Sequence, residues 1–497
     1  VEDFFFEPQN GGSTQRMRVV FTTKPMYGYW PHSVFKRLGV PGPKPVPFFG
    51  NMLEYRKGIH NFDMECFSEV RIYEARQPSI CILDTEIIKT VLIKECYSLF
   101  TNRRSLRLQG PLYDAVTIAE DEDWKRIRSV LSPSFTNGRL KEMFEIMKSH
   151  SRSFFGAYSM DVVTSTAFDP FVTNFKKLLK FDLLNPFVVP FITPVLEKMG
   201  ISIFPTAVTN FFYTSLQRSM FFVSDFLQKR VDFMQMMIES QTSEKENMNG
   251  KESNKGLNDH EILSQSLVFI FAGYETSNKT LSFLFYNLAS NPDTMKKLQE
   301  EIDETFPNKA EVDYDTVMNM DYLDAALNES LRLYPVIFRL QRVCKKTVEI
   351  NGVTIPKDTV ALIPTYALHR DPEYWTEPDT FKPERFTQEN KKSIEQYAYM
   401  PFGLGPRNCI GMRFALVIIK LAVVEILQKF DISLSEETKV RIFCLKSCKP
   451  CKANVMNIGN ILDNSAFKSN HFPGRIAVSH INHQSYFSSF PIRFLWS

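Results

Sequence analysis

The sequence contains no apolar run of eighteen or more residues, so it shows no segment with the length and composition of a transmembrane helix. Its first thirty residues offer only two short apolar clusters, Phe4–Phe6 and Val19–Phe21. A secretory leader starts with basic residues, whereas Glu2, Asp3 and Glu7 stand at this start. We therefore predict neither a membrane anchor nor a signal peptide from these residues.

The sequence also has few cysteines and a small net charge. Eight cysteines spread over 497 residues are too few for a disulfide-stapled secreted scaffold, which favours a reducing compartment or the cytosolic side of a membrane. A net charge of +3 gives no sign of a nucleic-acid partner, and we expect none. Apolar side chains are plentiful at 44%, with 44 Phe, so a large aromatic core can form.

The most informative stretch is Phe402–Gly411, F-G-L-G-P-R-N-C-I-G, which places Cys409 at the end of a glycine-rich loop. The next residues, Gly411–Phe430, are apolar on most faces and predict a buried helix. The free N–H groups and positive dipole end of a helix stabilise a thiolate. Cys409 is therefore well placed to carry negative charge.

Three interpretations of Cys409 compete. A lone cysteine is most often a buried core residue. A nucleophile is the second possibility, but no Ser/Cys-His-Asp spacing surrounds it. The third is a single thiolate ligand to a haem iron, and we favour it because Gly403, Gly405 and Gly411 leave room for a flat cofactor. Arg407 stands two residues before the cysteine, where it can pair with a propionate.

The loop matches F-x-x-G-x-R-x-C-x-G at Phe402, Gly405, Arg407, Cys409 and Gly411. It resembles the haem-binding loop of the cytochrome P450 superfamily. The wider wording resembles the vertebrate drug- and steroid-oxidising family three, subfamily A. The resemblance implies a mainly α fold with small β-sheets, in which haem b lies between a long central helix and the helix after the cysteine loop.

The resemblance also implies a domain organisation. Residues 35–437 are expected to form the haem-thiolate monooxygenase domain, although the family's segments between Ser149 and Pro170 are shortened or absent here. Residues 1–34 are an atypical N-terminal segment without a clear anchor. Residues 438–497 are a divergent tail for which we predict disorder.

Asn258–Ser290 is the longest helical pattern, with a capping-box-like start at Asn258 and Glu261. An interior glycine costs about 1 kcal/mol relative to alanine, so Gly273 requires an explanation. Close helix packing is one, and a widened groove for dioxygen is the other. The second is favoured because A-G-x-E-T is the family's oxygen-activating motif: Thr276 would hold the oxygen and Glu275 would relay protons.

Another helix, predicted over Asp121–Leu131, carries acids in its first turn and bases later, which suits the helix dipole. Trp124 and Arg128 share one face because they are four residues apart. Ordinary packing with a surface charge would explain this pair. The resemblance implies instead that the haem propionates are bound by a set of residues from several segments: Arg103, Trp124, Arg128, Arg342 and Arg407. Lys125 and Arg126 are expected to face outward, towards an electron donor.

The resemblance places further residues around the cofactor. The substrate pocket is expected to be lined by Thr117, Phe271, Ala272, Ile337 and Phe338, and Phe402 contacts the haem. On a helix predicted over Tyr322–Tyr334, Glu329 and Arg332 are three residues apart, which alone indicates an ordinary surface pair. In the family such a pair is buried and joined by an arginine, here Arg385.

His369 lies in A-L-H-R-D-P and is predicted to be a hydrogen-bonded structural residue, not an axial ligand. Asn351-Gly352 predicts the turn of a hairpin over Val348–Ile355. The tail contains C-x3-C-x2-C at Cys444, Cys448 and Cys451, a spacing found in iron–sulfur proteins. An accidental cluster or translated non-coding sequence explains it better, because no strand–helix alternation surrounds it.

The implied function is a monooxygenase that inserts one atom of O₂ into bulky lipophilic substrates such as steroids, drugs and xenobiotics. An NADPH-dependent reductase would supply electrons, with cytochrome b5 as a further donor. Kinship alone implies the cytoplasmic face of the endoplasmic reticulum membrane. The alternative is a catalytically impaired relic or gene-model variant of the family, and an iron–sulfur protein built on the tail cysteines is a rival from another class.

Overall fold

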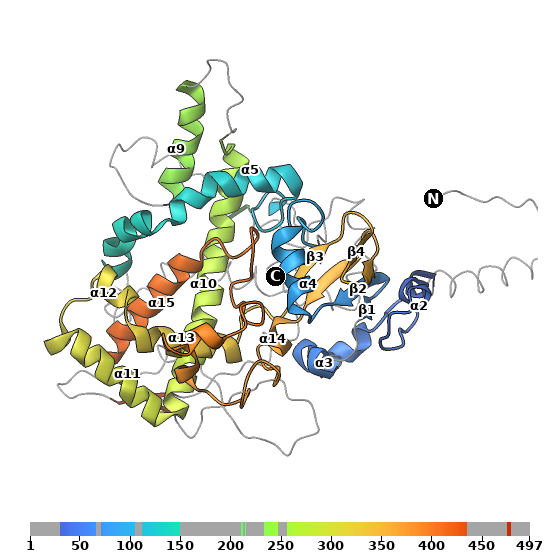
Figure 1. Ribbon diagram of the computed structural model, residues 1–497. Coiled ribbons are helices and arrows are strands. Elements are labelled where there is room, and N and C mark those ends of the chain that lie inside the picture. Colours follow the sequence, from blue (N-terminus) through green and yellow to red (C-terminus); the bar gives the residue numbers. More distant parts are fainter. Residues whose placement is uncertain are drawn as a thin grey trace, which may run out of the picture.

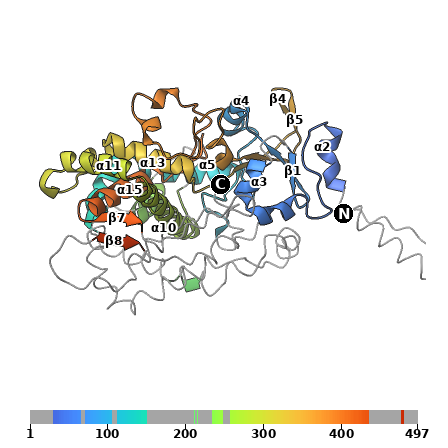
Figure 2. The ribbon, with the colours of Figure 1, turned by 90° about the horizontal axis from the view of Figure 1, so that it is seen from below.

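A computed structural model describes residues 30–65, 71–104, 112–149, 210, 211, 214, 233–246, 256–434 and 475–478. Helix α10 (Asp259–Ser290) is the longest of the described elements and runs through the middle of the molecule (Figure 1). Two views place α11 and α15 on one side of α10 and the strands β1 and β2 on the other (Figures 1 and 2). The mainly α fold with small sheets is thus confirmed.

The sequence patterns located the principal helices well. Helix α5 spans the predicted Asp121–Leu131. Helix α10 starts with the predicted capping box, in which the Asn258 side chain accepts from the Glu261 N–H and the Glu261 carboxylate accepts from the Asn258 N–H. The other helices confirmed within a few residues are α13 (Asp321–Leu333) and α15 (Met412–Leu427).

Shorter helical elements complete this part of the chain. The helices are α2 (Val34–Arg37), α3 (Ile59–Glu65), α4 (Thr85–Lys89), a helix over 137–149, α9 (Phe233–Glu246), α11 (Pro292–Thr305), α12 (Tyr314–Met318) and α14 (Thr365–Leu368). A π-helical turn, η3 (Thr90–Lys94), follows α4 directly.

The largest sheet joins segments that are far apart in the sequence. Its strand order is β1-β2-β6-β3, formed by β1 (Arg71–Glu74), β2 (Gln77–Cys81), β6 (Val360–Ile363) and β3 (Leu340–Val343). Strand β2 pairs antiparallel with β1 and parallel with β6. The predicted hairpin is present as β4 (Val348–Ile350) and β5 (Val353–Ile355).

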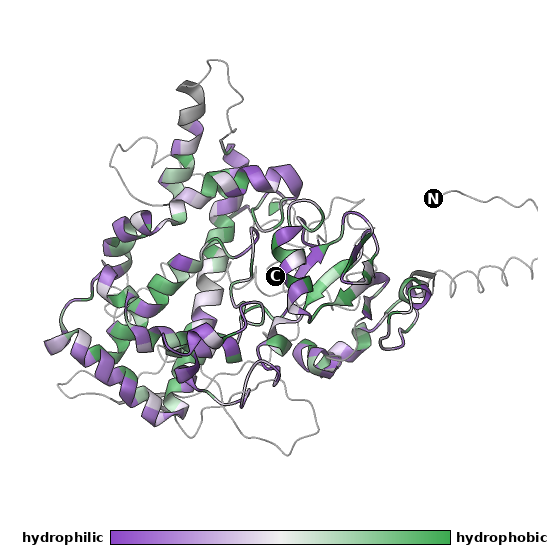
Figure 3. Cartoon of the chain, viewed as in Figure 1, coloured by the Kyte–Doolittle hydropathy of each residue, from purple (hydrophilic) through white to green (hydrophobic). Residues whose placement is uncertain are grey.

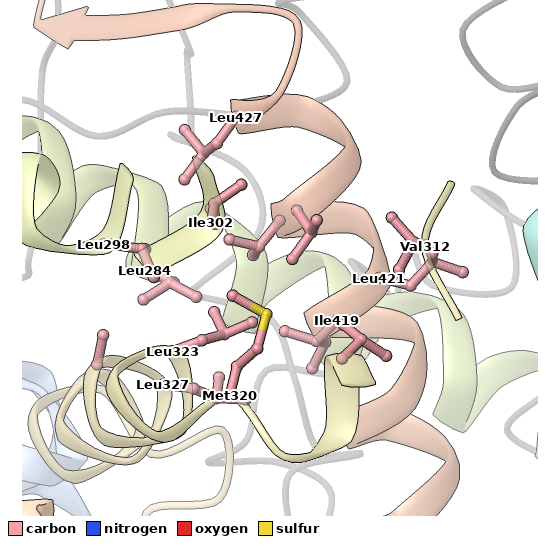
Figure 4. Close-up of a cluster of buried hydrophobic side chains, with 14 of the residues drawn as sticks. Leu284, Leu298, Ile302, Val312, Met320, Leu323, Leu327, Ile419, Leu421 and Leu427 are labelled. Carbon is pink, nitrogen blue, oxygen red and sulfur yellow. The ribbon is translucent and has the colours of Figure 1, made fainter. Parts of the chain in front are cut away.

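A helical core fixes the positions of α10 and α15. Apolar side chains from α10, α11, α13 and α15 interlock there, including Leu284, Ile302, Leu327 and Leu421 (Figure 4). Figure 3 shows α11 at the edge of the molecule mostly in hydrophilic colours, whereas the central α10 is mostly hydrophobic or intermediate. Within the described ranges, no helix is both long and apolar enough to cross a bilayer.

Strand β7 (Asp431–Leu434) pairs in parallel with β8 (Arg475–Val478). Strand β8 lies inside the tail for which the sequence predicts disorder, so these four residues differ from that expectation. The remaining residues of the tail, including Cys444, Cys448 and Cys451, lie outside the described residues, as does the stretch between Ser149 and Pro170.

Candidate functional site

Backbone hydrogen bonds fold the cysteine loop, Phe402–Gly411, and fix the position of Cys409. The N–H of Gly403 donates to the Met400 carbonyl at 3.0 Å, and that of Asn408 to the Gly405 carbonyl at 3.0 Å. The N–H of Cys409 itself donates to the Phe402 carbonyl at 2.8 Å. Phe402 also packs its ring against the helical core. The loop is therefore closed by its own backbone, three residues before α15 begins.

Gly405 is required for a reason other than the predicted one. Its φ of +72° lies in the left-handed region, and a Cβ there would stand 2.0 Å from the Leu92 carbonyl oxygen of η3. Room for a flat cofactor was the expectation for this glycine. The structure instead shows that the loop approaches the backbone of η3 too closely for any side chain.

Cys409 differs from the other cysteines of the described residues. Cys81, Cys96 and Cys344 are buried, whereas Cys409 is exposed. Protein packed around the Cys409 sulfur nevertheless raises the pKa of the thiol by desolvation. A backbone hydrogen bond from Gly411 and the positive charges of Arg128 and Arg103 act in the opposite direction. Cys409 is thus an exposed residue whose sulfur faces groups that stabilise a thiolate.

Three arginines from separate segments gather beside this loop. Arg342 and Arg407 are buried and Arg103 is partly buried, with Arg103 Nη2 donating to the Arg407 carbonyl at 3.1 Å. Burial lowers the pKa of Arg103 to about 9, of Arg342 to about 10 and of Arg407 to about 8. Repulsion adds to this effect at Arg103 and Arg407. Placing these three positive charges close together and largely away from water destabilises the folded protein when no anion is bound.

The same arginines have hydrogen-bond donors to spare. The buried Nε atoms of Arg103, Arg342 and Arg407, together with Arg407 Nη1, have no hydrogen-bond partner among the described residues. Buried polar groups are normally satisfied, and guanidinium groups pair best with carboxylates. Two anionic carboxylates of a bound group would neutralise this cluster. These side chains would therefore fit the propionates of a haem bound through Cys409.

Helix α5 supports the loop and the arginine cluster from one face. The Trp124 ring is buried and lies 4.2 Å from the Arg407 guanidinium. Arg128 is directed at Asn408, donating from Nη1 to its carbonyl and from Nη2 to its Oδ1, both at 2.9 Å. The structure thus brings Trp124 to the cluster and uses Arg128 to hold the residue before Cys409.

The expectation that Arg126 faces outward is wrong. Its guanidinium forms an ion pair with Glu261 at the start of α10, and Nη1 donates to the Gly256 carbonyl at 3.1 Å. Lys125 is more exposed and pairs with Glu122 at 2.6 Å. Arg126 therefore joins α5 to α10, because a buried carboxylate at Glu261 requires a cation.

Two neighbours of the arginine cluster were missed by the sequence patterns. The carbonyl of Ala119 accepts from Arg407 Nη2 at 2.7 Å. Cys96, fully buried, hydrogen-bonds Arg342. A backbone carbonyl and a single buried cysteine carry no recognisable motif, so only the folded chain reveals them.

On α10, Thr276 turns its hydroxyl towards the same helix and donates to the Ala272 carbonyl. Apart from its chain neighbours and the adjacent backbone of α10, no described atom lies within 4 Å of the place that a Cβ on Gly273 would occupy. Among the described residues, close helix packing therefore does not explain this glycine. The side chains of Phe271 and Glu275 lie outside the described residues.

The expected pocket residues divide between two places. Thr117 belongs to a segment held on α10 by Gln265, whose Oε1 accepts from the Val116 N–H at 2.7 Å. Gln265 and Ala272 are two helical turns apart on one face, so this segment lies along the face that carries Ala272.

On the sheet side, Ile337 packs against the core cluster there. Phe338 lies between His60 and Tyr366, with ring centroids 5.8 and 5.5 Å away. The structure thus places Phe338 against α3 and α14.

A buried network stands behind the loop. Arg332 Nε and Nη2 each donate to the Glu329 carboxylate at 2.8 Å, and Arg385 Nε reaches Glu329 at 3.3 Å. Arg332 Nη1 donates to the His369 carbonyl at 2.8 Å, and His369 Nε2 accepts from the Met400 N–H at 3.0 Å. Since Met400 closes the cysteine loop, this network supports it; His369 is structural, as predicted.

The sequence model described as cytochrome P450 matches residues 40–175 and 155–450 of the chain. The chain belongs to the cytochrome P450 family. The two matched pieces overlap at residues 155–175, which includes much of the stretch between Ser149 and Pro170 where the sequence departs from the family pattern.

Individual relatives agree with this assignment. The chain is 58% identical over 464 residues to cytochrome P450 3A27 of Oncorhynchus mykiss, covering 85% of this chain and 89% of the relative. It is 59% identical over 468 residues to cytochrome P450 3A30 of Fundulus heteroclitus, covering 86% and 93%. It is 50% identical over 455 residues to cytochrome P450 3A7 of Homo sapiens, covering 84% and 90%.

The protein is therefore a P450 monooxygenase of the 3A type that acts on lipophilic substrates and holds haem b through a cysteine thiolate. It requires O₂ and a reductase that donates electrons. These comparisons favour the enzyme over the relic alternative. Within the described ranges, no group of three His, Cys, Asp or Glu residues forms another metal site.

Proposed function

We propose that this protein is an unspecific monooxygenase of steroids, drugs and other bulky lipophilic compounds, on the cytoplasmic face of the endoplasmic reticulum membrane. Its electron donor is an NADPH-dependent reductase, with cytochrome b5 as a further donor. The observation that carries the proposal is the exposed Cys409 beside Arg103, Arg342 and Arg407, whose buried Nε atoms have no hydrogen-bond partner among the described residues. That pairing matches one thiolate-held iron and two propionates.

We assign the side chains the following roles. Cys409 is the iron ligand, and Arg103, Arg342 and Arg407 with Trp124 bind the propionates. Arg128 orients the loop through Asn408. Haem with a thiolate ligand supplies the O₂ binding and activation, because electron density from sulfur favours O–O cleavage.

Two residues of α10 are assigned to proton delivery. The Thr276 hydroxyl holds a proton at Oγ1, which donates to the Ala272 carbonyl within the helix. The Glu275 carboxyl exchanges protons with solvent and returns them to this site. Thr117, Phe271, Ala272, Ile337 and Phe338 are assigned to substrate binding.

The absorption spectrum of the reduced, carbon-monoxide-treated protein tests the thiolate. We expect a strongly red-shifted Soret band for the wild type and its loss in Cys409→Ala. Cys344→Ala is the matched control. Cys344 is buried in the core cluster on the sheet side and is not part of the cysteine loop, so its substitution should leave the band in place. A Soret band at the ordinary position in the wild type would refute thiolate ligation.

Turnover with purified donors tests the finer assignments. We expect NADPH-dependent reductase to support oxidation of a steroid, and cytochrome b5 to raise the rate. Reductase-independent turnover, or failure to oxidise any bulky lipophilic compound while the red-shifted band is intact, would contradict the donor and the substrate class respectively.

A further inference from the structure

The first residue of α5 has an unusual backbone conformation. Asp121 has a φ of +46°, in the left-handed region that non-glycine residues rarely adopt. The N-cap residue, Glu120, makes no side-chain capping hydrogen bond. The Asn102 side chain takes that role: its Oδ1 accepts from the Asp121 N–H at 2.9 Å, and its Nδ2 donates to Asp121 Oδ2 at 3.1 Å. An amide from another segment thus caps α5.

Lys345 completes this arrangement from the far end of β3. Its ammonium group forms an ion pair with Asp121 Oδ1 and donates to Thr101 Oγ1 at 2.9 Å. The Lys345 N–H donates to the Leu99 carbonyl at 3.0 Å, and the Val343 N–H donates to the Asn102 carbonyl at 2.8 Å. Three segments are therefore tied together at one carboxylate.

Each tied segment carries part of the arginine cluster. Arg103 follows Asn102, Arg342 lies in β3, and Trp124 lies one turn into α5. Arg103, Arg342 and Arg407 carry like charges and gather beside the cysteine loop. The Arg103–Arg407 hydrogen bond and the Trp124–Arg407 ring contact link part of the cluster, and the Lys345 contacts join the segment that carries Arg342 to it.

We propose that Asp121 is a positioning residue for the propionate-binding side chains, holding Arg103, Arg342 and Trp124 in register through Asn102 and Lys345. This inference rests on the haem-thiolate function proposed above. Asp121 does not touch the cofactor; it sets where the side chains that do so are presented. The Asp121 and Lys345 side chains are 50% and 29% exposed, so their contribution belongs to the modest range of partly exposed ion pairs.

Asp121→Asn is the sharpest variant. Asparagine tolerates the left-handed conformation, so the substitution removes the charge without changing the backbone. Lys345→Met removes the partner while leaving the helix start intact. Glu122→Gln is the matched control, since it removes one acidic charge at the next position, where the side chain is 84% exposed and pairs only locally with Lys125.

We expect haem transfer to apomyoglobin to become roughly two- to fivefold faster in Asp121→Asn and in Lys345→Met. The double variant should be no faster than either single variant, because both remove the same interaction. Resonance Raman bands of propionate bending should shift in these variants and stay unchanged in Glu122→Gln. A lowered melting temperature with wild-type Raman bands and transfer rates would show that Asp121 is merely a helix cap.

The reduced carbon-monoxide spectrum distinguishes a failure of the haem-thiolate function from a failure of the positioning role of Asp121. If the wild type lacks the red-shifted Soret band, the haem-thiolate function fails. If the wild type and all variants keep that band while release rates and propionate bands match the wild type, only the positioning role is overturned.

Discussion

Thr276 stands on α10 with its hydroxyl donating to the Ala272 carbonyl one turn earlier. This bond keeps the hydroxyl proton within the helix, three residues after Gly273, whose Cβ position no described atom from outside α10 approaches within 4 Å. A threonine in such a place costs the helix little and leaves an exchangeable proton close to the predicted oxygen site.

We predict that Thr276→Ala retains the haem-thiolate spectrum but diverts much of the consumed O₂ to hydrogen peroxide, because proton delivery loses its hydroxyl group. The measurement is the ratio of peroxide to oxidised product per NADPH. Thr280→Ala is the control: its hydroxyl makes the same kind of bond, to the Thr276 carbonyl at 2.9 Å. An equal ratio of peroxide to oxidised product in both variants would show that Thr276 does not take part in proton delivery.

His369 gives a residue-scale prediction about acid stability. Burial, followed by the charges of Arg332 and Arg370, lowers its pKa from 6.5 to about 3. The unfolded chain therefore binds a proton below pH 6.5 that the folded chain does not bind until about pH 3. This histidine costs about 2 kcal/mol of stability at pH 5 relative to neutral pH.

His369→Gln keeps an acceptor for the Met400 N–H but cannot be protonated. We expect the variant to lose less stability than the wild type between pH 7 and pH 5, by about 2 kcal/mol. Thermal unfolding at both pH values measures this difference. Parallel losses in the two proteins would show that His369 does not contribute to acid sensitivity.

At the scale of elements, the position of the cysteine loop depends on its close backbone contact with η3. Two requirements act on Gly405: a positive φ and a backbone contact with Leu92 that leaves no room for a Cβ. The glycine motif was recognisable in the sequence, but its physical reason was not, because η3 lies more than three hundred residues earlier in the chain.

We predict that Gly405→Ala loses the red-shifted carbon-monoxide band, because the loop must move away from Leu92 and takes Cys409 with it. Gly352→Ala is the matched control, with a similar φ of +76° and no described atom within 4 Å of the new Cβ. It should cost only about 1–2 kcal/mol of backbone strain and keep the band. Normal haem content in Gly405→Ala would show that the loop can shift without harm.

At the scale of the whole molecule, the fold brings together an arginine cluster that lowers the stability of the folded state unless an anion is bound to it. Arg342 is buried with an unpaired Nε, whereas the nearby Arg339 is buried but paired with Asp63 and Glu74. Binding a dianionic cofactor stabilises the folded state by mass action. The two arginines should therefore respond differently to removal of the haem.

We predict that Arg342→Met lowers the melting temperature of the haem-loaded protein but leaves that of the haem-free protein unchanged or higher. Replacing a buried unpaired charge with an apolar side chain is neutral or stabilising. Arg339→Met should destabilise both forms by about 3–5 kcal/mol, since it strands buried carboxylates. Calorimetry of both forms measures this; a parallel loss for Arg342→Met would contradict the role of the cofactor charge.

The sequence by itself determined the family and the principal helices and predicted Cys409 as the haem ligand, because these depend on local spacing: F-x-x-G-x-R-x-C-x-G around Cys409, and the capping box at Asn258. Only the tertiary structure decided which cation meets which carboxylate. Arg126 turns inward to Glu261, and Asp121 joins Asn102 and Lys345. Such pairs depend on distances between segments far apart in the chain, and no local pattern encodes those distances.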